Sequence, residues 1–277
     1  MKMKINRRDF LKSTVVTSLY FAGFGLPSFA NNRSKKNLVI IMLRGGMDGL
    51  CAIPIKEDEV FEKLRSKINL ERVLSLTNDF DLHPALQSFK NLWDQNLASA
   101  VHATSIPYTG RSHFDGQNLM ESGGKIPYKV KTGWLGRGMK VAGLKQEGLA
   151  LALPMPLLLR GVPQNNNYFP TKGKLPTDKV LSLLKDVYKD SSEDELIGML
   201  EIIKSRPKER SYAADDLYSL ANEAGTLMKE PDGPRVAVFE VGGFDTHAAQ
   251  GGVHGTHSDC LKDMDLIFAT LKKRLKE

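Results

Sequence analysis

Two uninterrupted apolar runs, each ending in paired glycines, constrain the fold of this chain most. They are NLVIIMLRGGMDGL (37–50) and PRVAVFEVGGFD (234–245). Neither run alternates with polar residues, which is typical of central strands buried on both faces of a parallel sheet. ASAVHAT (98–104) predicts a third strand. The prolines in GLALALPMPLLLRG (148–161) predict an edge strand or two short strands.

Segments with helical spacing lie between these runs, and two of them, 176–190 and 191–205, begin with Thr or Ser followed by acidic residues, which suits a helix start. Alternating strands and helices predict an α/β fold with a mostly parallel sheet flanked by helices. We expect one domain over 31–277, with a helical cap at about 163–232. The last helix carries an apolar stripe at Leu261, Met264, Phe268, Leu271 and Leu275. The predicted helices are 83–96, 176–190, 191–205, 213–229 and 259–277.

The first thirty residues have the layout of a twin-arginine export signal. Arg7 and Arg8 precede a moderately apolar stretch at 15–26, and Ser-Phe-Ala ends at Ala30. The stretch is too short, and too rich in Ser, Thr and Gly, to span a bilayer comfortably. We therefore predict passage through the twin-arginine translocase, cleavage after Ala30, and a periplasmic or secreted location.

Charge and cysteine content narrow the function only a little. The whole chain has 39 basic and 32 acidic residues; five and one of these lie in the predicted signal, which leaves a formal charge of about +3. This ordinary balance gives no reason to expect nucleic-acid binding. Cys51 and Cys260 would both reach an oxidising compartment, where they could form a disulfide or stay free.

Polar residues follow three of the predicted strands, at the edge where ligands gather in open α/β sheets. Asp245 and His247 share one face of an extended segment, and a carboxylate with an imidazole suits zinc or another divalent ion. The candidate residues at the three strand ends are Arg44 and Asp48; Arg111, Ser112 and His113; and Asp245 and His247.

Each candidate also has a purely structural interpretation. Asp48 between glycines is a common turn acid. Ser112 would cap a helix, a role compatible with anion binding or nucleophilic attack at the same helix start. His254 and His257 lie three residues apart among glycines, so we expect solvated loop side chains rather than ligands.

An ordered set of motifs is similar to a family of secreted bacterial proteins called domain of unknown function 1501. That family is grouped with the alkaline phosphatases and sulfatases. The motifs lie between 38 and 252, and with the twin-arginine start and the last helix the likeness covers the whole chain. They are LVIIMLRGGMDGL, LHPAL, GRSHFDGQNLMESG, GWLGR and GGFDTHAAQGG.

The resemblance implies a metal-dependent hydrolase of phosphate or sulfate esters. Asp48, Asp245 and His247 would bind divalent metal, with zinc expected, and Ser112 would be the nucleophile. Arg44, Arg111 and His113 would hold an anionic small-molecule or polymer substrate. These roles are what the resemblance implies for the matching positions in this sequence.

The chain departs from the family at its end. Family members continue past the helix at 259–277 with Glu-Phe-Gly-Arg and Asp-His-Gly segments, which do not occur before Glu277. We therefore expect a sheet that lacks at least one C-terminal strand and a metal shell that is incomplete, with weakened or lost activity. The alternatives are a non-catalytic exported protein that binds a partner or anionic ligand, or a decayed fragment of a longer protein.

Overall fold

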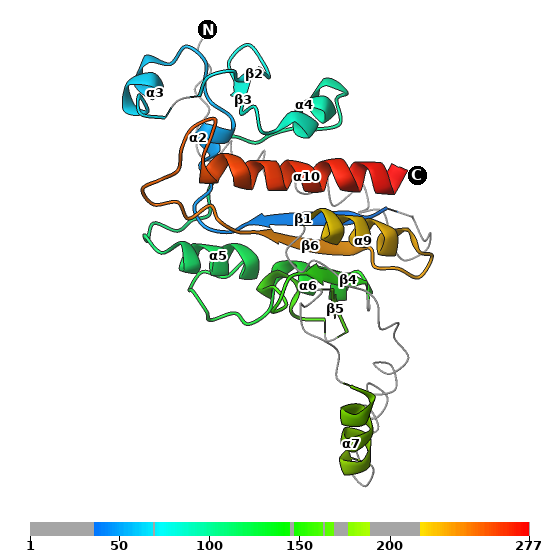
Figure 1. Ribbon diagram of the computed structural model, residues 1–277. Coiled ribbons are helices and arrows are strands. Elements are labelled where there is room, and N and C mark those ends of the chain that lie inside the picture. The colour runs from blue at the N-terminus through cyan, green and yellow to red at the C-terminus, as the bar shows by residue number, and fades with distance from the viewer. Residues whose placement is uncertain are drawn as a thin grey trace.

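A computed structural model describes residues 36–68, 70–144, 147–162, 164–168, 177–188 and 217–276 (Figure 1). The predicted export signal (1–30) and the predicted helix 191–205 lie outside these residues. The elements are β1 (Leu38–Leu43), α2 (Gly49–Ala52), α3 (Glu59–Leu64), β2 (Leu74–Ser75), β3 (Asp81–Leu82), α4 (Gln87–Asp94), α5 (His113–Ser122), α6 (Trp134–Val141), β4 (Gly148–Leu151), the 3₁₀ turn η1 (Leu157–Leu159), β5 (Asn166–Asn167), α7 (Asp178–Tyr188), α9 (Leu217–Lys229), β6 (Val236–Val241) and α10 (Thr256–Lys276).

The main sheet is parallel throughout, with strand order β1-β6-β4-β5. Leu43 of β1 pairs with Val241 of β6, so these two strands end side by side. The predicted α/β class, a parallel sheet flanked by helices, is thus confirmed. The kinship with alkaline phosphatases and sulfatases stays a prediction.

Alternate residues of the strands face opposite layers, because side chains in a strand point to the two faces in turn. One face of β6 packs Ala237, Phe239 and Val241 against a cluster that includes α9 and α10 residues. The other face packs Val236 and Val238 against residues of α6 and η1. Both faces of the sheet are therefore covered, as the lack of polar alternation predicted.

Three strand predictions are wrong. The segment 98–104 forms no strand: Val101 is 80% exposed, and the ring of His102 donates from Nε2 to the Ile53 carbonyl at 3.1 Å. A run of Ala and Ser offers little large apolar surface to bury. β1 lies at an edge of the described sheet rather than at its centre, and β4 lies between β6 and β5 rather than at an edge. The position of a strand within the sheet depends on which strands pair with it, and the sequence of the strand alone does not show this.

α10 begins three residues earlier than predicted and buries Leu261 and Leu271 of the expected stripe, with the other three partly buried. It also holds α4, because Asp265 accepts hydrogen bonds from the backbone N–H groups of Ser88 and Phe89 at 2.8 and 2.9 Å. This carboxylate replaces the missing side-chain cap of α4. α4 and α10 are therefore coupled by a buried charge as well as by apolar contact.

The predicted cap at about 163–232 is described only in part. α9 packs on α10 and β4, as part of the helical layer over the sheet, whereas Figure 1 draws α7 away from the sheet.

No helix in the described ranges is both long and apolar enough to cross a membrane. Both cysteine thiols are buried and free, so the disulfide considered from the sequence is not formed.

Candidate functional site

The loops that leave β1 and β6 run side by side and together form the edge on which the candidate residues lie. The backbone N–H of Arg44 donates to the Val241 carbonyl at 2.8 Å. Gly45 has a φ of +111°, and a Cβ there would lie 2.5 Å from the backbone nitrogen of Asp245. Only glycine permits this approach. The glycine after β1 therefore fixes where the aspartate after β6 can sit.

Asp245 lies between two imidazoles. Its Oδ1 is 2.8 Å from Nε2 of His247, and its Oδ2 is 3.4 Å from Nε2 of His113. His113 comes from the first turn of α5, so three predicted residues from two distant segments meet here. The side chains of Asp245 and His247 are 41% and 78% exposed. The group is therefore open to solvent and to a ligand.

Ser112 caps α5, as its structural interpretation predicted. Its Oγ accepts a hydrogen bond from the backbone N–H of Asp115 at 3.2 Å, and its φ and ψ are extended. Arg111, the residue before it, is exposed. The Ser112 hydroxyl thus lies at a helix N-terminus, one residue from the imidazole that contacts Asp245. A helix N-terminus favours negative charge.

Asp48 belongs to a different group of residues. It caps α2, with Oδ1 accepting from the backbone N–H groups of Leu50 and Cys51 at 3.1 and 3.2 Å. Its Oδ2 forms an ion pair with Arg65 and accepts from Nε2 of Gln250 at 2.8 Å. Burial alone would raise the pKa of Asp48, but the hydrogen bonds from Arg65 and Gln250 lower it. Both oxygens are committed, so the turn role describes this residue better than a metal ligand.

Arg44 is neutralised by two carboxylates. Its guanidinium forms ion pairs with Glu121 of α5 and Glu240 of β6, and its Nη1 donates to Gln117 at 3.3 Å. Burial alone would lower the pKa of Arg44, but the two carboxylates raise it above its ordinary value. Glu121 is 4% exposed and also accepts from the backbone N–H of Leu158 at 2.9 Å. Arg44 therefore joins α5, β6 and η1 more than it presents charge to an anion.

One face of α5 supplies these contacts in order. His113, Gln117 and Glu121 are spaced by four residues, which places them on the same side of a helix. They reach Asp245 and Arg44, the residues after the two neighbouring strands. Beyond Glu121 opens a hollow of about 420 Å³. Its lining includes Arg44, Glu121, Tyr128, Lys131, Arg160 and Glu240.

The prediction that His257 is a solvated loop residue is wrong, whereas His254 is exposed as expected. His257 is 0% exposed, in the first turn of α10, with its ring edge-on to Phe244 at 5.4 Å. Its Nε2 accepts from the backbone N–H of Asp48 at 3.2 Å, and Nδ1 has no partner among the described residues. His83 is equally buried and donates from Nε2 to the Gly252 carbonyl at 3.1 Å. Burial lowers the pKa of both rings.

The sequence therefore located the edge but not all of its residues. Glu121, Glu240, Arg65 and Gln250 were not predicted; only Glu121 had a signal, its helical spacing from His113. Within the described ranges, no group of three or more His, Cys, Asp and Glu side chains is arranged to hold a metal ion. Comparison with protein-family models, with curated proteins and with solved structures finds no match.

Proposed function

We propose that this chain is an exported hydrolase-type protein that acts on phosphate or sulfate esters with a divalent cation. The observation that supports it is the Asp245 carboxylate, held between His113 and His247 at the carboxyl edge of a parallel sheet. This edge is where ligands bind in open α/β folds. The sequence resemblance supports the same reaction.

The chemistry of the donor set suits a divalent cation. Carboxylate oxygen and imidazole nitrogen are ordinary ligands of zinc and related ions. Asp245 and His247 would hold the ion, and His113 lies against the other carboxylate oxygen. When bound, a divalent cation polarises an ester oxygen and offsets negative charge in the transition state. Asp48 is left out of this set because Arg65 and Gln250 already occupy its Oδ2.

The other residues bind and position the substrate. Ser112 supplies the nucleophilic oxygen at the start of α5, where first-turn N–H groups favour an anion. Arg111 is exposed next to it and would bind the non-bridging oxygens of the ester. The hollow beyond Glu121 gives space for the remainder of the substrate. Arg44, paired with two carboxylates, keeps α5 in place in this scheme.

A second candidate is an exported protein that binds an anionic ligand without turnover. Specific contacts favour it: Ser112 Oγ already accepts a backbone N–H, and Asp48 and Arg44 are committed to ion pairs. A protein of this kind would use the α5 N-terminus and Arg111 for binding and would need no metal.

Metal analysis and an ester assay separate the two candidates. We expect the purified chain to contain stoichiometric divalent metal and to hydrolyse p-nitrophenyl phosphate or p-nitrophenyl sulfate. Asp245→Asn should lose the metal. Asp259→Asn removes one negative charge from an exposed side chain elsewhere, and this variant should retain the metal. Ser112→Asn keeps a capping oxygen but removes the hydroxyl, so it should retain metal and lose turnover. Absence of both metal and turnover would leave the binding protein as the function.

A further inference from the structure

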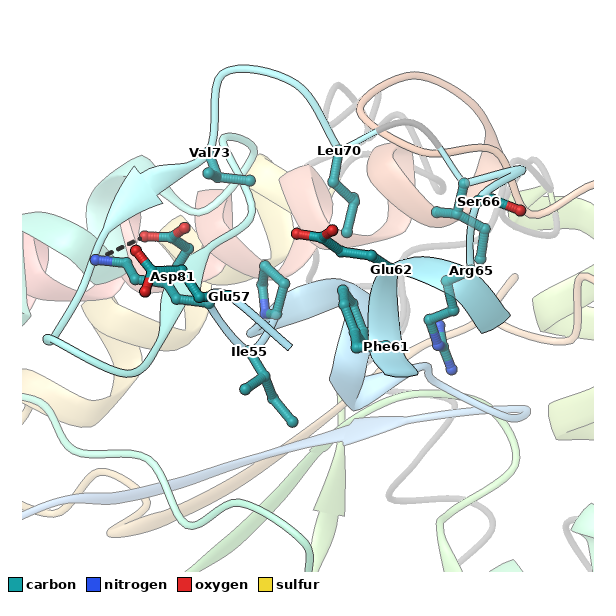
Figure 2. A pocket seen from close by; sticks show the side chains of 12 residues that line it. Ile55, Glu57, Phe61, Glu62, Arg65, Ser66, Leu70, Val73 and Asp81 are labelled. Atoms are coloured by element: carbon teal, nitrogen blue, oxygen red, sulfur yellow. Dashed lines mark ion pairs between the residues drawn. The ribbon is translucent and has the colours of Figure 1, made fainter. Parts of the chain in front are cut away.

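A second hollow, of about 440 Å³, lies between α3, the segment after it and β3, away from the edge that carries Asp245 (Figure 2). Its size falls within the range of small-molecule sites. About half of its lining is apolar, so it would bury the hydrocarbon part of a ligand. The apolar residues are Pro54, Ile55, Phe61, Ile68, Leu70 and Val73.

The cationic side chains of this hollow are already engaged. Nζ of Lys56 contacts Asp81 Oδ1 at 3.1 Å and donates to Ser75 Oγ and to the Thr77 carbonyl at 2.9 and 2.7 Å. The Arg65 guanidinium pairs with Asp48, outside the hollow, and lies 5.7 Å from the centre of the Phe61 ring. Neither cation therefore has free charge to offer an anionic ligand.

Two carboxylates of the lining are not engaged in this way. Glu57 and Glu62 have no ion-pair partner among the described residues, and both are exposed. Figure 2 shows the Glu62 carboxylate beneath Leu70, directed toward the side of the hollow where Glu57 and Asp81 lie. With Lys56 balanced by Asp81 and Arg65 by Asp48, the hollow retains the negative charge of Glu57 and Glu62. A ligand that fits has an apolar body and a positive group.

We propose that this hollow binds a small organic cation, a primary amine carried on a short hydrocarbon chain. The ammonium group would lie between Glu57 and Glu62, and the hydrocarbon would lie against Leu70, Val73 and Phe61. The assignment is independent of the ester-hydrolase proposal, because it uses none of the residues near Asp245.

Calorimetric titration of the full chain with hexylammonium chloride tests the site, with hexanol and sodium hexanoate as probes of equal length. We expect saturable one-to-one binding of the amine, weaker binding of hexanol and none of hexanoate. Shortening the amine to butylammonium should weaken binding by about fourfold for each methylene removed. Equal binding of the three hexyl probes, or no saturable binding of the amine, would overturn the proposal.

Matched variants identify the groups that bind the cation. Glu62→Gln and Glu57→Gln should each weaken hexylammonium binding by up to about fivefold, the upper end of the range for an exposed ion pair. Glu59→Gln removes the same charge from the same helix at a position outside the hollow, and it should leave binding unchanged. A loss at Glu59 as large as the loss at Glu62 would mean general attraction to an acidic surface, and the assignment would fail.

Discussion

Glu121 offers the sharpest test of how the edge is held together. It is buried, and its two oxygens have different partners: Oε1 pairs with Arg44, while Oε2 accepts from the backbone N–H of Leu158. Glu121→Gln retains an oxygen for Leu158 but removes the charge. Glu121→Ala removes both contacts and leaves a buried N–H group without an acceptor.

The two contacts have separable magnitudes. A hydrogen bond to a charged group contributes about 1.5–3 kcal/mol, and the Arg44 pair lies toward the lower end because Arg44 is 22% exposed and still has Glu240. We therefore expect Glu121→Gln to lower the free energy of unfolding by about 1–2 kcal/mol. An unsatisfied buried N–H group adds about 1–3 kcal/mol. Glu121→Ala should therefore lose about 2–5 kcal/mol, and more than Glu121→Gln.

Urea unfolding followed by far-ultraviolet circular dichroism measures both losses. The control is Glu230→Gln, an exposed glutamate that should change stability by less than about 0.5 kcal/mol. The slope against urea should stay constant, since the native surface is unchanged. The two-contact account of Glu121 would be refuted if Glu121→Gln and Glu121→Ala had the same free energy of unfolding. It would also be refuted if Glu121→Gln lost no more stability than the control Glu230→Gln.

Two further outcomes follow from the same edge. Gly45→Ala should cost about 2–3 kcal/mol, because a φ of +111° strains any other residue and the Cβ would meet Asp245; unchanged urea stability would contradict the close approach. His83 and His257 have pKa values lowered by burial from 6.5, so the stability they contribute is complete above pH 6.5 and is lost as pH falls through their folded pKa values. As the pH is lowered from 6.5, the urea concentration at the midpoint of unfolding should decrease, and it should decrease less steeply in His83→Gln than in the unchanged protein. The same pH dependence in both proteins would show that His83 is not a source of this loss.

The strands beside the site could be predicted because the features that mark them lie within each segment of the sequence. The Val and Ile runs that became β1 and β6 need burial wherever they lie, and paired glycines at their ends mark tight loops. The edge position of β1 could not be predicted, because it depends on which strands pair with it. The run at 98–104 shows the opposite error: apolar composition without bulky residues does not specify a strand.

Only the site contacts between residues close in the sequence could be predicted. Asp245 and His247 are two residues apart and do meet, although His247 lies in a turn with a φ of +45° rather than in the extended chain that the spacing predicted. Arg65 and Glu121 became partners of Asp48 and Arg44 through tertiary packing, across 17 and 77 residues of sequence. No rule of sequence spacing could have predicted these two long-range ion pairs.

The spacing of His113, Gln117 and Glu121 also limits how α5 can change in evolution. One residue inserted between His113 and Gln117 would turn the rest of the helix by about 100°, so that Gln117 and Glu121 could no longer face the edge together with His113. Substitutions at outward positions such as Phe114, which is 66% exposed, avoid that penalty. Descendants of this sequence should therefore vary α5 in composition while conserving its length between residues 113 and 121.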